Sequence, residues 1–214
     1  MRTFPLKAKG TVFVLLRIKS YILMRNLIFI LGFVLSANIL SAQSKAVVLQ
    51  IEHRVGTDTS AVGIEGINNL GNPFRLNRIE YYVDEIILTH DGGSIDTADA
   101  LILVDGFNAT SINLGTFALD SLESLRFAVG VNSSLNHLDP TTYNPSHPLA
   151  PKSPSMHWGW TSGYRFIAAE GLSGSTFSQI FEFHGLGDGN YAHLTLPTSG
   201  TLVGSDTLMI TITA

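Results

Sequence analysis

The stretch Phe74-Arg-Leu-Asn-Arg-Ile-Glu-Tyr-Tyr-Val-Asp-Glu-Ile-Ile-Leu-Thr89 says most about the architecture of this chain. Its apolar side chains alternate with charged and polar ones, which is typical of a strand with one face buried and one face in water. The segment is long enough for one long strand or two shorter ones. Asp91-Gly92-Gly93 follows and marks a tight turn.

The rest of the chain after Lys45 continues this pattern of short strands separated by turn residues. Turns fall about every ten residues, as in β-sandwiches and Greek-key barrels. No window of twelve residues after the N-terminal segment shows an apolar period of 3.6. We therefore expect an all-β protein, a single antiparallel, Greek-key-like β-sandwich over residues 45–214. The run at residues 208–214 ends in mid-strand, which indicates either a domain truncated at its C-terminus or a sandwich that lacks an edge strand. The other strands are expected at residues 46–53, 100–104, 124–131, 164–170, 177–184, 191–196 and 206–213.

One segment breaks this rhythm. Residues 132–155 are polar, long and rich in proline. Loops of this length in compact domains are usually functional or disordered. Repeated proline stiffens a chain and favours an ordered path. We therefore expect a long, Pro-rich functional loop on the sandwich, with prolines at 140, 145, 148, 151 and 154.

The N-terminal segment, residues 1–42, has the pattern of a signal peptide. It is basic, has no acidic residue, and contains an apolar run at residues 27–35 followed by small and polar residues. A start at Met24 would by itself give an ordinary signal peptide. The alternative is a membrane anchor, but residues 27–42 are short and interrupted for a membrane span. We expect an exported protein, periplasmic, on the outer surface or extracellular, with no stable membrane span after cleavage.

Charge and cysteine content limit the partners of the exported part. Six of the thirteen Lys and Arg residues lie in residues 1–42, which leaves seven basic and seventeen acidic residues and a formal net charge of −10. Such a chain is unsuited to nucleic acid and to anionic membranes, but it permits cations. The chain has no cysteine, so a metal site must use imidazole, carboxylate, thioether, backbone or modified side chains.

Histidines gather in the Pro-rich loop and at its exit. Of the seven in the chain, His137, His147 and His157 lie there. Imidazole is the commonest transition-metal ligand. Surface or capping roles are the plainer alternative, and Asn136 with Asp139 could instead serve calcium, although regular calcium-loop spacing is absent.

The segment Met156-His-Trp-Gly-Trp160 is the second unusual feature. If it is extended, both tryptophans share one face with Met156, and the plain interpretation is that the indoles belong to the core. The chain shows no zinc-hydrolase motif, nucleophile elbow or glycine-rich phosphate loop. We therefore expect no enzymatic activity from the polypeptide itself.

Several motifs occur in order over most of residues 46–196. They are Val129-Gly-Val-Asn-Ser-Ser-Leu-Asn-His-Leu-Asp-Pro140, His147-Pro-Leu-Ala-Pro151, Met156-His-Trp-Gly-Trp160, Gly163-Tyr-Arg-Phe166 and Glu170-Gly171, with Tyr81-Tyr82, His90-Asp-Gly-Gly93 and Phe183-His184 fitting the same pattern. In this order they resemble the MbnP-like copper-binding family, which is related to the MopE and CorA copper proteins.

The resemblance implies a secreted β-sandwich that holds copper through histidines. Carried over to this sequence, it gives His137, His157 and His184 as ligands, with His147 next. It also implies oxidation of a tryptophan to kynurenine by a dihaem partner enzyme of the MauG type. Trp158 is then the expected kynurenine precursor, and Trp160 is the alternative.

Three functional hypotheses follow. The first is an exported copper-binding protein for copper acquisition, storage or delivery. The second is a structural or adhesive β-sandwich whose histidines and tryptophans are scaffold residues. The third is a redox enzyme, or an electron-transfer partner of a dihaem peroxidase, with copper as its cofactor.

Overall fold

A computed structural model describes residues 43–214 of the chain. The expected signal peptide, residues 1–42, and the start at Met24 lie outside the described residues. Within residues 43–214, no helix is both long and apolar enough to cross a membrane.

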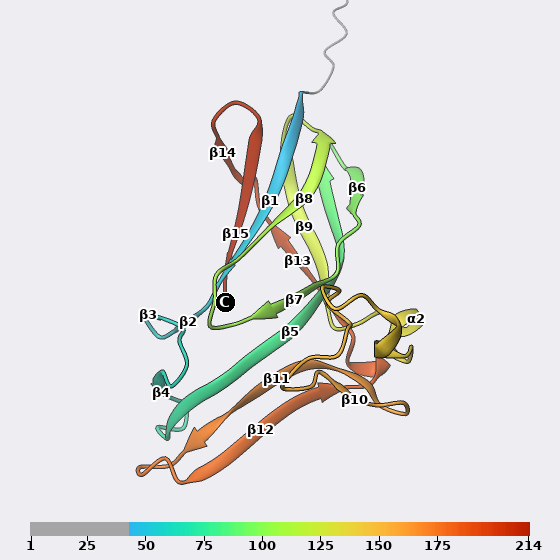
Figure 1. Ribbon diagram of the computed structural model, residues 1–214. Helices are drawn as coiled ribbons and strands as arrows, with labels where there is room; N and C mark the ends of the chain where they lie inside the picture. Colours follow the sequence, from blue (N-terminus) through green and yellow to red (C-terminus); the bar gives the residue numbers. More distant parts are fainter. Residues whose placement is uncertain (1–42) are drawn as a thin grey trace, which may run out of the picture. The chain divides into compact units, whose positions relative to one another are not determined.

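The protein is built from two main β-sheets (Figure 1). In the smaller sheet all neighbours are antiparallel except β1 and β15, which run parallel. The last strand lies inside this sheet, with a partner on each side. In spatial order the strands are β14 (Thr201–Val203), β15 (Thr207–Thr213), β1 (Ser44–Glu52) and β8 (Thr110–Ala118).

The larger sheet is organised around β5 (Pro73–His90), a single strand of 18 residues. The alternating stretch is therefore one long strand rather than two. It pairs with β11 (Gly163–Ser173) on one side and with β9 (Leu122–Val129) on the other. Farther out, β10 (His157–Gly159) pairs with β11, and β13 (Ala192–Pro197) pairs with β9. Strand β12 (Gln179–Leu186) pairs with β11. Three short strands also pair with β5: β4 (Glu65–Ile67), β6 (Ser94–Ala98) and β7 (Ile102–Asp105). A separate two-stranded ribbon consists of β2 (Arg54–Val55) and β3 (Asp58–Thr59).

Alternation along β5 divides the buried residues into two clusters. Val83 belongs to the core between the two sheets, and its neighbour Tyr82 belongs to a second cluster beneath the Pro-rich loop. Successive side chains of a strand point to opposite faces, so one strand supports both clusters. The predicted all-β sandwich is confirmed. The second cluster consists of Tyr82, Val131, Leu149, Met156, Tyr164, Phe166 and Ala168.

The Pro-rich loop is ordered and packed, as its prolines predict. It contains a short helix, α2 (Ser133–Asn136), and a 3₁₀ turn, η1 (Pro140–Thr142). Two tyrosine hydroxyls of the larger sheet fasten it: Tyr82 donates to the carbonyl of Pro148 at 3.2 Å, and Tyr164 donates to that of Leu149 at 2.6 Å. These bonds satisfy polar groups at the loop–sheet boundary, where unpaired ones would be costly.

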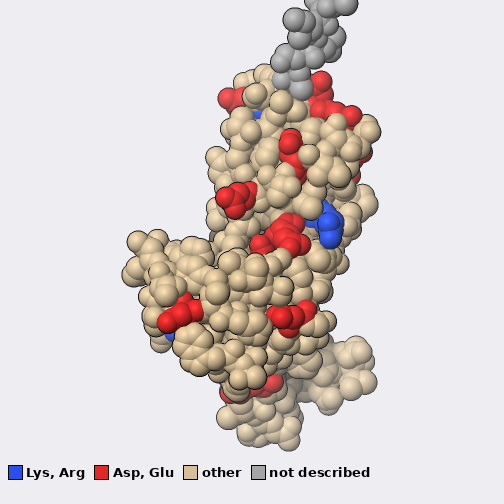
Figure 2. All heavy atoms as spheres, turned by 90° about the vertical axis from the view of Figure 1, so that its right-hand side faces the viewer, with Lys and Arg blue, Asp and Glu red and all other residues tan. Residues whose placement is uncertain are grey.

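The surface of the described part is acidic, in agreement with its composition. Figure 2 shows the face on the right of Figure 1, where carboxylate side chains are scattered over the molecule and few basic side chains lie between them. Such a surface attracts cations over a distance of about one Debye length, roughly 8 Å at physiological salt.

Candidate metal centre

The Pro-rich loop meets strand β11 at one end of the larger sheet through Asn136, whose side chain is fully buried. The Asn136 carbonyl oxygen accepts a hydrogen bond from the backbone N–H of Tyr164 at 2.8 Å. Its amide donates to Asp188 Oδ1 at 2.7 Å. Asp188 begins the 3₁₀ turn η2 (Asp188–Asn190). One amide thus holds α2, β11 and η2 together and sets the position of the next residue, His137.

His157 lies beside this junction with one ring nitrogen unused. Its ring packs edge-on against Tyr164 at 5.0 Å and against Trp160 at 5.7 Å between centroids. The Nε2 atom is buried and has no hydrogen-bond partner. Burial lowers the pKa of His157, and the nearby His137 lowers it further while Asp139 opposes the shift. The imidazole is therefore held neutral, the form that binds metals.

His137 faces the same place from the end of α2. Its Nδ1 lies 3.3 Å from the carbonyl oxygen of Trp160, and its Nε2 lies 3.4 Å from Asp188 Oδ2. A neutral ring that donates from Nδ1 to the carbonyl keeps a lone pair on Nε2. Metal-binding histidines commonly have this arrangement, because the carbonyl fixes the tautomer and the orientation of the ring.

Both tryptophans are exposed, so the interpretation of the indoles as core residues is wrong. The exposed fraction is 54% for Trp158 and 62% for Trp160, whereas Met156 is buried. The expected alternation fails because β10 is only three residues long and its register shifts between His157 and Gly159. Oxidants and partner proteins therefore have access to both indoles.

Trp158, on β10, packs against a second group of side chains on β11 and β12. The guanidinium of Arg165 lies 4.3 Å from the centroid of the indole, and the ring of His184 lies 5.7 Å from it. His184 Nε2 is 2.8 Å from Glu170 Oε1, which also accepts from Arg78 at 2.8 Å. Trp158 and His184 are thus neighbours, and the carboxylate of Glu170 orients His184.

His147 serves the loop itself. Its Nδ1 accepts the backbone N–H of Leu149 at 3.1 Å, and its ring stacks on Tyr143 at 4.3 Å between centroids. The structure therefore brings His137, His157 and Trp160 together, pairs His184 with Trp158, and keeps His147 as a capping residue.

The carboxylates near the loop are engaged in local hydrogen bonds. Asp139 Oδ1 accepts from the backbone N–H of Thr141 at 2.9 Å and from its hydroxyl at 2.7 Å, and the Asn136 side chain is bonded on both sides. These bonds weaken the calcium alternative. In residues 43–214, no group of three or more His, Asp or Glu side chains is arranged to hold a metal ion. A metal at the His137–His157 pair thus requires another kind of donor as well.

His90 forms a further charged cluster that spacing did not single out. The imidazole is 5% exposed and lies between two carboxylates, with Nδ1 3.0 Å from Asp91 and Nε2 3.1 Å from Asp96. Burial lowers the pKa of His90, but the hydrogen bonds with Asp91 and Asp96 outweigh burial and leave the pKa raised. Asp91 also accepts the backbone N–H groups of Asp120 and Ser121, so this cluster closes the turn after β5.

We expect His90 to stabilise the protein mainly at acidic pH. Its folded pKa lies above the unfolded value of 6.5, so its contribution is complete below that value and is lost as pH rises through the folded pKa. In denaturant unfolding, His90→Gln should therefore destabilise the protein more at about pH 5.5 than at about pH 8. An equal loss at both pH values would show that His90 is not charged in its cluster.

The structure is thus that of a β-sandwich protein with two groups of neighbouring histidine and tryptophan side chains on β10 and the elements around it. The MbnP family model matches residues 44–214, and the chain therefore belongs to the MbnP family. The solved structure of MbnP from Methylosinus trichosporium has the same fold, with a TM-score of 0.56 and 14% sequence identity over 73% of this chain and 72% of that one. No curated relative matches the chain.

Proposed function

We propose that this protein binds copper outside the cytoplasm, for acquisition, storage or delivery, and acts as a binding protein rather than an enzyme. The observation that carries the proposal is the unpartnered, buried Nε2 of His157 beside His137. Membership of the MbnP family supports copper as the metal. The acidic composition and the lack of cysteine agree with a cation site built from imidazoles.

The donors that fit copper at this place are the Nε2 atoms of His157 and His137. The first is buried without a partner, and the second retains a lone pair when Nδ1 donates to the Trp160 carbonyl. Asp188, 3.4 Å from His137 Nε2, compensates part of the positive charge of the metal. A third metal donor would approach the two histidines from the side on which Trp160 is exposed.

The indoles are the proposed source of that donor. Conversion of tryptophan to kynurenine breaks the C2–C3 bond, removes C2 as formate and leaves a ketone and an aromatic amine, both of which can bind a metal. A dihaem partner of the MauG type would supply the oxidant, and the exposure of both indoles suits such a reaction. Trp158, the precursor expected from the resemblance, adjoins His184, whereas Trp160 adjoins the His137–His157 pair.

A structural or adhesive role is the second candidate, because large apolar side chains are exposed along β12 as well as on β10. Exposed fractions are 74% for Phe183 and 77% for Ile180 on β12, in addition to the two indoles. Exposed aromatic groups of this kind are common in protein–protein contacts. This role requires no metal and no modified side chain, which makes the two candidates separable.

Metal analysis of the protein exported by its native host, with intact mass and peptide mapping on the same sample, tests the proposal. We expect bound copper and a peptide that has gained oxygen and lost carbon at Trp158 or Trp160. Copper without a mass change would support the histidine site and remove kynurenine from the proposal. Absence of both would leave the structural role.

A further inference from the structure

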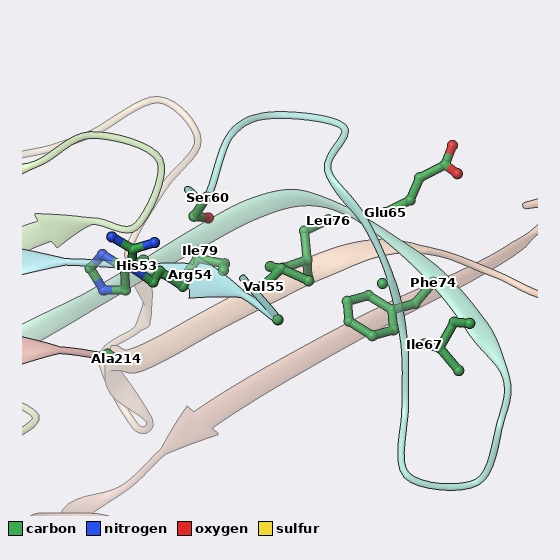
Figure 3. A pocket seen from close by; sticks show the side chains of 12 residues that line it. His53, Arg54, Val55, Ser60, Glu65, Ile67, Phe74, Leu76, Ile79 and Ala214 are labelled. Atoms are coloured by element: carbon green, nitrogen blue, oxygen red, sulfur yellow. The ribbon is translucent and has the colours of Figure 1, made fainter. Parts of the chain in front are cut away.

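A hollow region lies at the open end of the sandwich, along the core-facing side of β5. Two cavities adjoin there and share His53, Ile79 and Ala214. The first, of about 450 Å³, is the one in Figure 3, with Phe74 and Leu76 farther along the same strand. The second, of about 460 Å³, continues along β5 past Tyr81 and Val83. Each volume falls in the range of small-molecule sites, roughly 300–1,000 Å³.

The second cavity is almost wholly apolar. Its inner wall is formed by buried side chains of both sheets, among them Ile51 and Phe127. Its outer wall includes Leu194, which is 41% exposed on β13. Apolar surface left open in this way is stabilised when a hydrocarbon displaces the water next to it.

Two buried polar side chains without a complete set of hydrogen bonds line this region. His53 lies where the two cavities meet, and Ser60 lies in the wall of the first cavity. His53 is 8% exposed, and its Nδ1 is buried without a partner, while its Nε2 lies 2.8 Å from the hydroxyl of Tyr81. Ser60 is 4% exposed, and its hydroxyl is also buried and unpartnered. Native proteins rarely leave two such groups unpaired in one region, so both are available to a ligand or an ordered water.

The chemistry of these groups favours an uncharged hydroxyl. Burial lowers the pKa of His53 against the opposing effect of Asp105, so the imidazole stays neutral. Depending on which partner of the Tyr81 bond donates, Nδ1 is either an acceptor or a donor. A ligand hydroxyl can do both, and so can the hydroxyl of Ser60.

We propose that the region binds a neutral amphipathic molecule, with a hydrocarbon chain in the apolar cavity and a hydroxyl group at His53 and Ser60. The site is separate from the proposed copper centre and does not depend on it. Strand pairing keeps its rim ordered, because Ala214 donates to the carbonyl of Glu52 at 2.9 Å and accepts from the N–H of Arg54 at 2.8 Å.

Calorimetric titration of the purified chain with hexan-1-ol, octan-1-ol and decan-1-ol tests the proposal. Affinity should rise about fifteenfold for each two methylene groups added, since each buried methylene contributes about fourfold. Decanoate should bind at least about tenfold more weakly than decan-1-ol, because its charge would be desolvated beside a neutral imidazole. No binding, affinity independent of chain length, or tighter binding of decanoate would overturn the proposal.

Three variants separate the parts of the site. Leu194→Glu should weaken decan-1-ol binding at least about tenfold, while Leu202→Glu, on β14 and outside both cavities, should change it less than about twofold. Ser60→Ala removes a hydroxyl that has no partner in the protein, so its melting temperature should be unchanged or higher while decan-1-ol binds about three- to tenfold more weakly. Binding unaffected by both Leu194→Glu and Ser60→Ala would place the alcohol elsewhere and overturn the assignment.

Discussion

His157→Phe is expected to abolish copper retention while leaving the fold intact. Phenylalanine keeps a ring that can pack edge-on against Tyr164 and Trp160, so the contacts of His157 survive. No hydrogen bond of Nε2 is lost, because this buried nitrogen has no partner. The variant loses the metal donor itself. Loss of a residue that only hydrogen-bonds a metal ligand lowers metal affinity about 10- to 100-fold, so here copper affinity should fall at least about a hundredfold.

The measurement is copper stoichiometry and competition with a chelator, together with unfolding by denaturant. His147→Phe is the matched control: it removes an imidazole from the same loop and should keep copper. It should lose about 1 kcal/mol of unfolding free energy, since Leu149 N–H then has no acceptor. Copper retained in His157→Phe but lost in His184→Phe would move the site to Trp158 and contradict the assignment.

Strand positions were largely predictable from sequence where alternation is long and uninterrupted. Strand β5 is the clearest case, because its apolar residues alternate over most of its 18 residues. Strand β8 was missed. Its alternation of Ile112 and Leu114 with polar residues is interrupted at Gly115, where the pairing with β1 shifts register. Short strands such as β10 depend on pairing with distant partners, and that information is not local.

Candidate site residues could be named from the sequence, but their division into two pairs could not. The order of motifs pointed to His137, His157, His184 and the two indoles. Their grouping depends on Asn136, which bonds to residues 28 and 52 positions away in the sequence. The buried environment of His53 likewise comes from Tyr81, 28 residues away. Contacts at such separations are set by the packed fold rather than by local pattern.

Gly163→Ala is expected to lower the free energy of unfolding by about 2–4 kcal/mol. Gly163 has φ of +71°, in the left-handed region that disfavours residues with a Cβ. An added Cβ would also collide with the side-chain and carbonyl oxygens of Asn136. That collision would displace a fully buried amide from its bonds to Tyr164 and Asp188.

Gly187→Ala isolates the backbone part of this cost. Gly187 has a similar φ of +82°, but nothing lies within 4 Å of its added Cβ, so only about 1–2 kcal/mol should be lost. Denaturant unfolding of both variants gives the comparison, and equal losses would show that Asn136 is not a rigid support. Because Asn136 adjoins His137 and bonds to Asp188, Gly163→Ala should also weaken copper binding about tenfold or more, whereas Gly187→Ala should weaken it less.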